Sequence, residues 1–128
     1  RIWGLIEDIY GPPRNAFNNI FVLNHFPLWM FNSAGQNITP DKLKKSSAEE
    51  IFRICNKYLS DIINLLNAEK IIGVGKYANK MAQNAIRENN LEGITIEEIP
   101  HPSPANPLAN KDKGAVWKKI SKRVITGK

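Results

Sequence analysis

The segment Lys70-Ile71-Ile72-Gly73-Val74-Gly75-Lys76 predicts a short strand that turns at glycine directly into a helix. The apolar spacing that follows extends this helix over residues 76–89. Gly93–Ile99 then has the β-branched composition of another strand, and an amphipathic helix closes the chain. Two strands joined through a helix form a parallel pair, with the helix packed on one face of the sheet.

The same alternation of helices and strands is expected nearer the N-terminus. Residues 1–10 carry apolar side chains at helical spacing, and Asn19–Leu23 is apolar enough for a short buried strand. Thr39-Pro40 offers a helix start, and Ser47 with Glu50 forms a capping-box pattern before a long helix. The apolar stripe expected on that helix contains Ile51, Ile54, Cys55, Tyr58, Leu59, Ile62, Ile63 and Leu66.

This alternation predicts an α/β fold with three layers, in which helices cover both faces of a central, mainly parallel sheet. The chain has 128 residues, 42% hydrophobic and 23% charged, which fits a single globular domain over residues 1–128. No apolar run approaches the ~20 residues needed to cross a bilayer, so no membrane partner is expected. The single cysteine, Cys55, permits no internal disulfide and suits a reducing compartment.

Positive charge gathers at the C-terminal end of the chain, whose formal net charge is +6. Seven of the eighteen Lys and Arg residues follow the last strand: Lys111, Lys113, Lys118, Lys119, Lys122, Arg123 and Lys128. On the final helix, four of them share the side opposite the apolar stripe, namely Lys118, Lys119, Lys122 and Arg123. Such a face is either simply solvated or follows a phosphate backbone.

Four prolines stiffen the segment before this helix, Pro100-His101-Pro102-Ser103-Pro104-Ala105-Asn106-Pro107-Leu108-Ala109-Asn110-Lys111. Proline fixes its own φ and keeps the preceding residue extended, so the whole segment is expected to be a rigid loop. Ligands of open parallel sheets bind beyond the carboxyl ends of the strands. Asn24 and His101 each follow such an end, which places a carboxamide and an imidazole at one edge. Taken singly, Asn24 could close an Asx turn and His101 could be an ordinary loop residue.

A second motif, Gly73-Val74-Gly75-Lys76-Tyr77-Ala78, resembles the glycine pattern of dinucleotide-binding sites. In those sites an acidic residue ends the next strand, whereas Glu92 precedes the next strand here. We therefore expect the glycines to permit a tight turn and close packing of the helix. A nucleotide-binding α/β enzyme stays open as an alternative.

Together, the motifs resemble the C-terminal portion of the single-strand-selective monofunctional uracil-DNA glycosylases, within the uracil-DNA glycosylase superfamily. The resemblance covers nearly the whole chain, from Arg1-Ile2-Trp3-Gly4 through Val22–Leu28, Gly35–Pro40 and Val74-Gly75-Lys76 to His101-Pro102-Ser103-Pro104. It implies a monomeric base-excision-repair enzyme that works without cofactor or metal, in the nucleus of a eukaryote or otherwise in the cytoplasm. Such an enzyme flips uracil, or an oxidised 5-substituted uracil, out of single- or double-stranded DNA and hydrolyses its N-glycosidic bond.

The resemblance also implies roles for particular residues. Asn24 would read the edge of the uracil, and His101 would stabilise negative charge on the departing base. The DNA-binding wedge would consist of Pro102, Ser103, Pro104, Ala105, Asn106, Asn110 and Lys111. Two departures weaken this wedge, because Ala105 replaces the arginine usual in the family and Asp112-Lys113 replaces a Gly-Trp pair.

The family's first motif, which carries a water-positioning asparagine and a stacking ring, has no counterpart in Gly11-Pro12-Pro13 or in Asn32-Ser33-Ala34-Gly35. It would lie upstream of Arg1. The domain is therefore expected to be truncated at its N-terminus and, as residues 1–128 alone, inactive. A homologue or module that binds DNA without cutting it is the other alternative.

Overall fold

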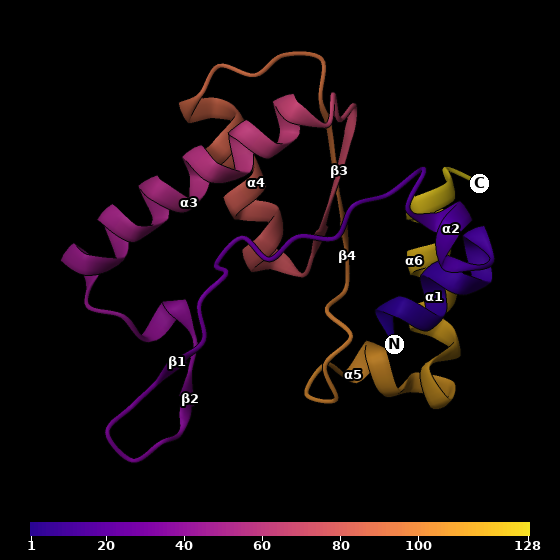
Figure 1. Ribbon diagram of the computed structural model, residues 1–128. Coiled ribbons are helices and arrows are strands. Elements are labelled where there is room, and N and C mark those ends of the chain that lie inside the picture. Colours follow the sequence, from indigo (N-terminus) through magenta and orange to yellow (C-terminus); the bar gives the residue numbers. More distant parts are fainter.

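The computed structural model describes the backbone of residues 1–128 and the side chains of all of them except Asp41. The chain contains both helices and strands, which alternate from α3 to α5 (Figure 1). In order, the elements are α1 (Ile2–Tyr10), α2 (Pro13–Ala16), β1 (Met30–Phe31), β2 (Asn37–Ile38), the 3-10 turn η1 (Pro40–Lys42), α3 (Lys45–Leu65), β3 (Lys70–Val74), α4 (Lys76–Glu88), β4 (Thr95–Ile99), α5 (Pro107–Asn110), the 3-10 turn η2 (Lys111–Gly114) and α6 (Ala115–Thr126).

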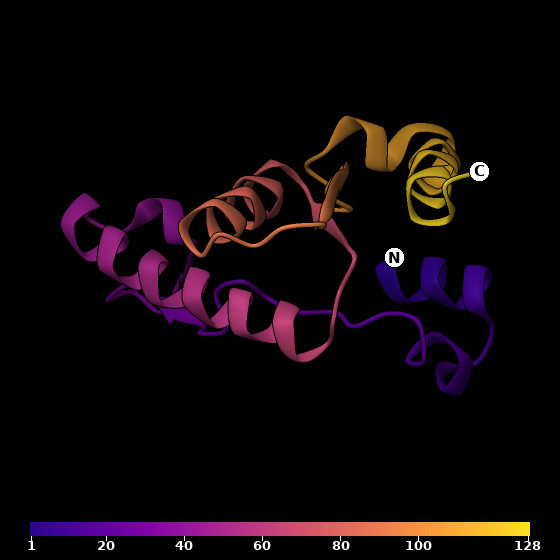
Figure 2. The same ribbon diagram turned by 90° about the horizontal axis from the view of Figure 1, so that it is seen from above.

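A small parallel sheet of β3 and β4 lies at the centre of the molecule, as the strand–helix–strand pattern predicted. Its register places Ile71 opposite Ile96 and Val74 opposite Ile99. The helix α4 joins the two strands and packs on them, and α3 packs against α4. Seen from above, α3 and α4 lie on one side of the strand pair, and α1 and α6 lie on the other (Figure 2). The chain is therefore a mixed α/β structure with helices on both sides of a two-stranded parallel sheet.

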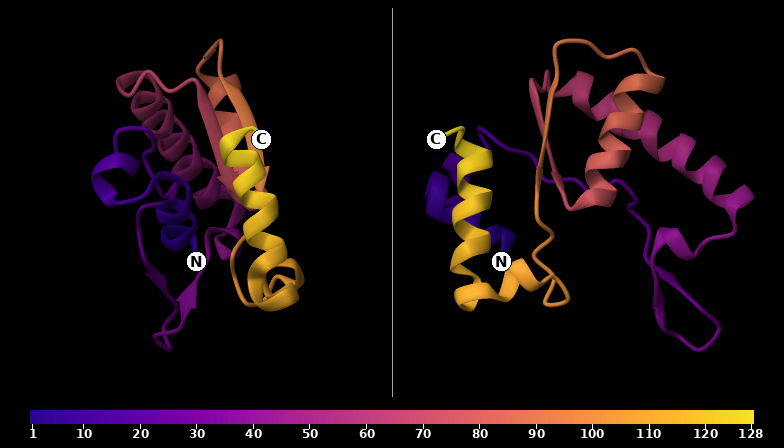
Figure 3. Two further views of the ribbon diagram at one scale, coloured as in Figure 1. Left: turned by 90° about the vertical axis from the view of Figure 1, so that its right-hand side faces the viewer. Right: turned by 180° about the vertical axis from the view of Figure 1, so that it is seen from behind.

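On the side of the sheet where α1 lies, α6 packs through a small apolar core. Leu5 of α1, Ala109 of α5 and Trp117 of α6 are buried together. The indole Nε1–H of Trp117 also donates a hydrogen bond to the carbonyl oxygen of Pro100 at 2.6 Å. As a result, α6 lies beside α1 (Figure 3) and is tied to the residue that follows β4.

The prediction of a strand at Asn19–Leu23 is wrong. The amides of Asn19 and Ile20 donate to the carbonyl of Ala16 in a turn after α2, and Phe21 is 61% exposed. A strand forms only where a neighbouring strand pairs its backbone groups, and the described residues offer this segment none. The two short strands β1 and β2 instead form an antiparallel hairpin that projects from the rest of the molecule (Figure 1).

The start of the long helix is also corrected. Thr39 is the N-cap of the short 3-10 turn η1, which begins at Pro40, whereas α3 begins at Lys45 with Lys44 as its N-cap. Ser47 therefore lies inside the first turn and caps nothing, because Lys45 and Ser46 already have helical backbone angles.

Only part of the expected stripe on α3 is buried. Cys55 and Ile63 are buried, whereas Ile54, Tyr58 and Leu66 are exposed. Burial also raises the pKa of the Cys55 thiol, in keeping with an inert core residue. The helix packs against α4 along one face, so the far side of its apolar surface is left uncovered. None of the described helices is long and apolar enough to span a bilayer.

Replacing Trp117 by phenylalanine tests the attachment of α6. Trp117→Phe keeps most of the buried ring but leaves the Pro100 carbonyl without its donor, which should lower the free energy of unfolding by about 1–3 kcal/mol. The matched control is Trp3→Phe, since Trp3 is 58% exposed and this change should cost less than about 0.5 kcal/mol. Urea denaturation followed by circular dichroism measures both, and equal losses would contradict the role given to this hydrogen bond.

Candidate functional site

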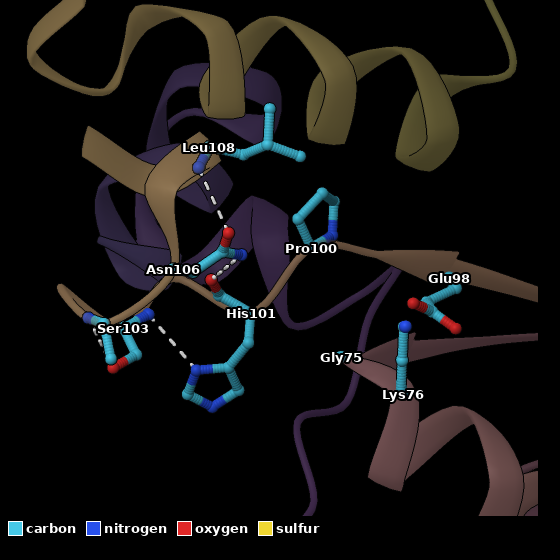
Figure 4. A pocket seen from close by; sticks show the side chains of 9 residues that line it. Gly75, Lys76, Glu98, Pro100, His101, Ser103, Asn106 and Leu108 are labelled. Carbon is cyan, nitrogen blue, oxygen red and sulfur yellow. Dashed lines mark hydrogen bonds between the residues drawn. The ribbon is translucent and has the colours of Figure 1, made fainter. Parts of the chain in front are cut away.

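The candidate site is an open pocket of about 500 Å³ beyond the carboxyl end of β4. Its lining includes Gly75, Lys76, Glu98, Pro100, His101 and Asn106. Lys76 begins α4, Glu98 is the last residue but one of β4, and the imidazole of His101 lies below the loop (Figure 4). The pocket therefore forms where the turn between β3 and α4 meets the proline-rich loop, the edge at which parallel sheets bind ligands.

The floor of this pocket is glycine backbone. Gly75 has φ +87° and ψ 165°, a conformation almost confined to glycine, and its N–H donates to the Ile99 carbonyl at 2.8 Å. A Cβ atom placed on Gly75 would lie 3.0 Å from Cβ of His101. A Cβ on Gly73 would lie 2.5 Å from backbone atoms of Asn79 in α4. Neither position has room for a Cβ atom unless its neighbours shift, which confirms that the glycines permit a tight turn and close packing of the helix.

Hydrogen bonds within the loop fix the imidazole of His101. The amide N–H of Ser103 donates to His101 Nδ1 at 3.1 Å, and the side-chain amide of Asn106 donates to the His101 carbonyl at 2.8 Å. Because Nδ1 accepts a hydrogen bond, the neutral ring carries its hydrogen on Nε2. That N–H faces away from the loop as a ready donor (Figure 4).

Further bonds make the loop rigid, as its prolines predicted. Ala105 N–H donates to Ser103 Oγ at 3.2 Å, and the Asn110 side chain donates to the Pro104 carbonyl at 2.5 Å. The guanidinium of Arg1 donates to the Pro102 carbonyl at 3.1 Å and to the Ala109 carbonyl at 2.8 Å. The same group reaches Asn110 Oδ1 at 3.1 Å. Arg1, the N-cap residue of α1, thus braces a loop that lies about one hundred positions away in the sequence.

The expected loop is one turn too long at its C-terminal end. Pro107–Asn110 forms the short helix α5, and Lys111 lies in η2. Proline fits the first helical position because the N–H that it lacks would have no partner there. Asn106 caps the turn, since its Oδ1 accepts a hydrogen bond from the amide of Leu108 at 3.1 Å. The predicted wedge residues therefore belong to a loop over residues 100–106 and the turn that follows.

Asn24, the other predicted site residue, is exposed and does not line this pocket. Its neighbour His25 is 9% exposed and bonds through both ring nitrogens. Desolvation by burial lowers the pKa of the His25 imidazole, against opposing effects of its hydrogen bond to Asn56 and of the charge on Glu88. The sequence analysis missed His25. One signal in the sequence was Asn56, a polar residue next to Cys55 on the buried face of α3.

The predicted basic face of α6 is present and solvent-exposed. Lys118, Lys119, Lys122 and Arg123 all lie on the surface, and Lys118 forms an ion pair with Asp8 of α1. The remaining cations line a second open hollow with Thr126 and Lys128. No group of three or more His, Cys, Asp or Glu side chains in the described part of the chain could hold a metal ion.

Comparison with known proteins gives one consistent result. Over 118 residues, which are 92% of its length, the chain is 35% identical to a protein of Bos taurus named single-strand selective monofunctional uracil DNA glycosylase. The chain is homologous to the C-terminal part of the glycosylases of this name. The glycosylase of the same name from Rattus norvegicus is 34% identical over 111 residues. The chain spans 43% and 40% of the lengths of these two glycosylases, respectively. No family model matches it.

The contact between Gly75 and His101 can be tested by adding one methyl group. Gly75→Ala strains the backbone and presses on His101, so the free energy of unfolding should fall by about 2–4 kcal/mol. Gly93→Ala is the control, because Gly93 also has positive φ (+72°) but nothing lies within 4 Å of an added Cβ. This control should cost about 1 kcal/mol. Equal losses in urea denaturation would mean that His101 does not rest on Gly75.

Proposed function

We propose that residues 1–128 belong to a monofunctional uracil-DNA glycosylase of base-excision repair. It would flip uracil, or an oxidised 5-substituted uracil, out of DNA and hydrolyse the N-glycosidic bond. Homology to proteins named for this activity supports the proposal. The observation that carries it is the bond from Ser103 N–H to Nδ1 of the pocket-lining His101, which leaves Nε2–H as a fixed donor.

Such a donor suits the chemistry of base release. When the glycosidic bond breaks, its electron pair stays on the uracil, and negative charge gathers partly on O2. An N–H placed beforehand at O2 stabilises this charge as it develops, without rearranging at the moment of reaction. A neutral imidazole is a sufficient donor. The role proposed for His101 is therefore to stabilise the leaving group.

Asn24 would supply the selectivity for uracil. Its side-chain amide can donate to uracil O4 while its oxygen accepts from N3–H. Cytosine presents the reverse pattern at the same two atoms. A cytosine in this site would leave two donors facing each other and two acceptors facing each other, so it would be rejected strongly.

DNA would approach across the proline-rich loop and the basic face of α6. In this proposal, Pro102, Ser103, Pro104, Ala105, Asn106, Asn110 and Lys111 contact the DNA around the extruded base. The exposed cations of α6 would follow the phosphate backbone on either single- or double-stranded DNA, which makes the affinity sensitive to salt. The protein would work as a monomer, in the nucleus if it is eukaryotic and otherwise in the cytoplasm.

Residues 1–128 would form the C-terminal part of a larger three-layer α/β/α domain. The uncovered apolar side chains of α3 and of the β1–β2 hairpin support this, since Ile54 is 57% and Phe31 is 51% exposed. Further strands and helices from the rest of the domain would cover them. Because catalysis needs a pocket with all of its groups fixed, residues 1–128 should be inactive alone.

One observation favours a second candidate, a homologue that binds DNA without cutting it. Asn24 does not line the pocket that contains His101, so the described residues do not by themselves form a complete base-reading site. Retained DNA affinity without uracil release by the complete protein would support this candidate.

His101→Leu tests the leaving-group role in the complete protein. The variant should lower the single-turnover rate of uracil release about 10²–10³-fold with little loss of DNA affinity, because the donor acts only as charge develops. Release is measured on uracil-containing single-stranded DNA, with purified residues 1–128 as the negative control. A variant with normal turnover and a lowered melting temperature would show that His101 merely packs the loop.

Asn24→Asp tests base reading in the same assay. A carboxylate cannot donate to O4 unless it is protonated, so transition-state stabilisation should fall by about 2–4 kcal/mol. The affinity for DNA without uracil should stay close to wild type, since that contact lies on the base. Uracil release at an unchanged rate would disprove the role of Asn24.

A further inference from the structure

A hydrogen-bond network that begins at the buried side chains of His25 and Asn56 and ends at the exposed residues Tyr77 and Glu88 lies directly beside Asn24. His25 Nδ1 is 3.0 Å from Tyr77 Oη, and His25 Nε2 is 2.8 Å from Asn56 Oδ1. The side-chain amide of Asn56 in turn donates to Glu88 Oε2 at 2.8 Å. Together they form the His25 network, which consists of His25, Tyr77, Asn56 and Glu88. It connects the loop before β1 with α3 and with both ends of α4.

The direction of each hydrogen bond in the His25 network follows from its end at Glu88. A carboxylate oxygen only accepts, so the Asn56 nitrogen must face Glu88 and the Asn56 oxygen must face His25. His25 therefore donates from Nε2 and, as a neutral ring, accepts on Nδ1 from the Tyr77 hydroxyl. Rotating the ring would break both bonds at once. The network thus specifies one orientation of the imidazole.

The aromatic neighbours of His25 restrict the ring further. Its centroid lies 5.7 Å from that of Tyr77 and 6.2 Å from that of Phe52, and the Tyr77 ring is nearly perpendicular to it. Two hydrogen bonds and two ring contacts therefore hold a side chain that is one residue from the exposed Asn24. Holding the His25 side chain also restrains the position of the Asn24 Cα atom, because the peptide plane between the two residues is rigid.

The same network is linked to the pocket through α4. Tyr77 lies in the first turn of this helix, two residues after Gly75. Gly75 in turn packs against the side chain of His101. The segments carrying Asn24 and His101 are thus both fastened to the turn at Gly75–Tyr77, although the two residues lie 77 positions apart in the sequence.

We propose that His25 is a positioning residue, held by Tyr77 and Asn56, that fixes Asn24 relative to His101 for reading the flipped base. This inference rests on the proposed glycosylase function and deepens it. A buried polar group contributes little to stability over an apolar one of the same shape, but its directional bonds specify one arrangement. Its effect is therefore exerted through Asn24, and the loss of either partner of His25 should impair base reading.

The test uses the complete protein and two variants that weaken the His25 network from opposite sides, Tyr77→Phe and Asn56→Ala. Each should lower the single-turnover rate of uracil release roughly 10-fold, since small misplacements of a binding group are costly. The preference for uracil over cytosine should fall in parallel. In an Asn24→Ala background, both variants should have almost no further effect on the rate. The matched control is Ile63→Val, a buried change on α3 outside the network.

The outcomes separate the two proposals. If the wild type releases uracil but both variants match Ile63→Val in rate and base preference, the positioning role is wrong and the proposed function stands. If the variants still lower the rate fully in the Asn24→Ala background, His25 does not act through Asn24 and the inference is likewise overturned. A wild-type protein that releases no uracil overturns both proposals.

Discussion

The approach of Gly75 to His101 is the contact on which the rest of the structure depends. The bare glycine lets the turn after β3 lie against the residue that follows β4, and its N–H bonds to the Ile99 carbonyl. Gly75 is also the N-cap of α4, two residues before Tyr77, which meets His25. It also forms the floor of the pocket below the proline-rich loop. A side chain at residue 75 would disturb both proposed parts of the site.

Elements determined by nearby residues could be predicted from the sequence. The strands β3 and β4, the helix between them and the basic face of α6 follow from spacing and composition, and the structure confirms them. The prediction of a strand at Asn19–Leu23 was wrong because a strand needs a neighbouring strand to pair with, which no local sequence pattern supplies. The capping-box prediction at Ser47 and Glu50 was wrong because the helix begins earlier, at Lys45, with Lys44 as its N-cap. Proline in the segment after His101 suggested a loop, whereas Pro107 begins a helical turn.

For the candidate site, too, the features that depend on nearby residues could be predicted, and those that depend on distant residues could not. The rigidity around His101 could be predicted, because its prolines and Asn106 lie within six residues of it. The importance of His25 could not, since its bonding partners are 31 and 52 residues away and lie on two different helices. A histidine in a loop is usually exposed, and only the packing of α3 against α4 buries this one. The relation of Asn24 to the pocket depends on that long-range packing and stays a prediction.

The bonds of Arg1 have a consequence for the order of folding. Its guanidinium reaches the loop at sequence separations of 101 to 109 residues. Such distant contacts are among the last to form, because the intervening chain must first lose its conformational freedom. The β3–α4–β4 unit can be in place while the segment after β4 is still mobile. A nascent or partly unfolded molecule would then display the His-Pro-Ser-Pro sequence without a fixed orientation of the imidazole, so the geometry of the pocket would be acquired only with the finished tertiary structure.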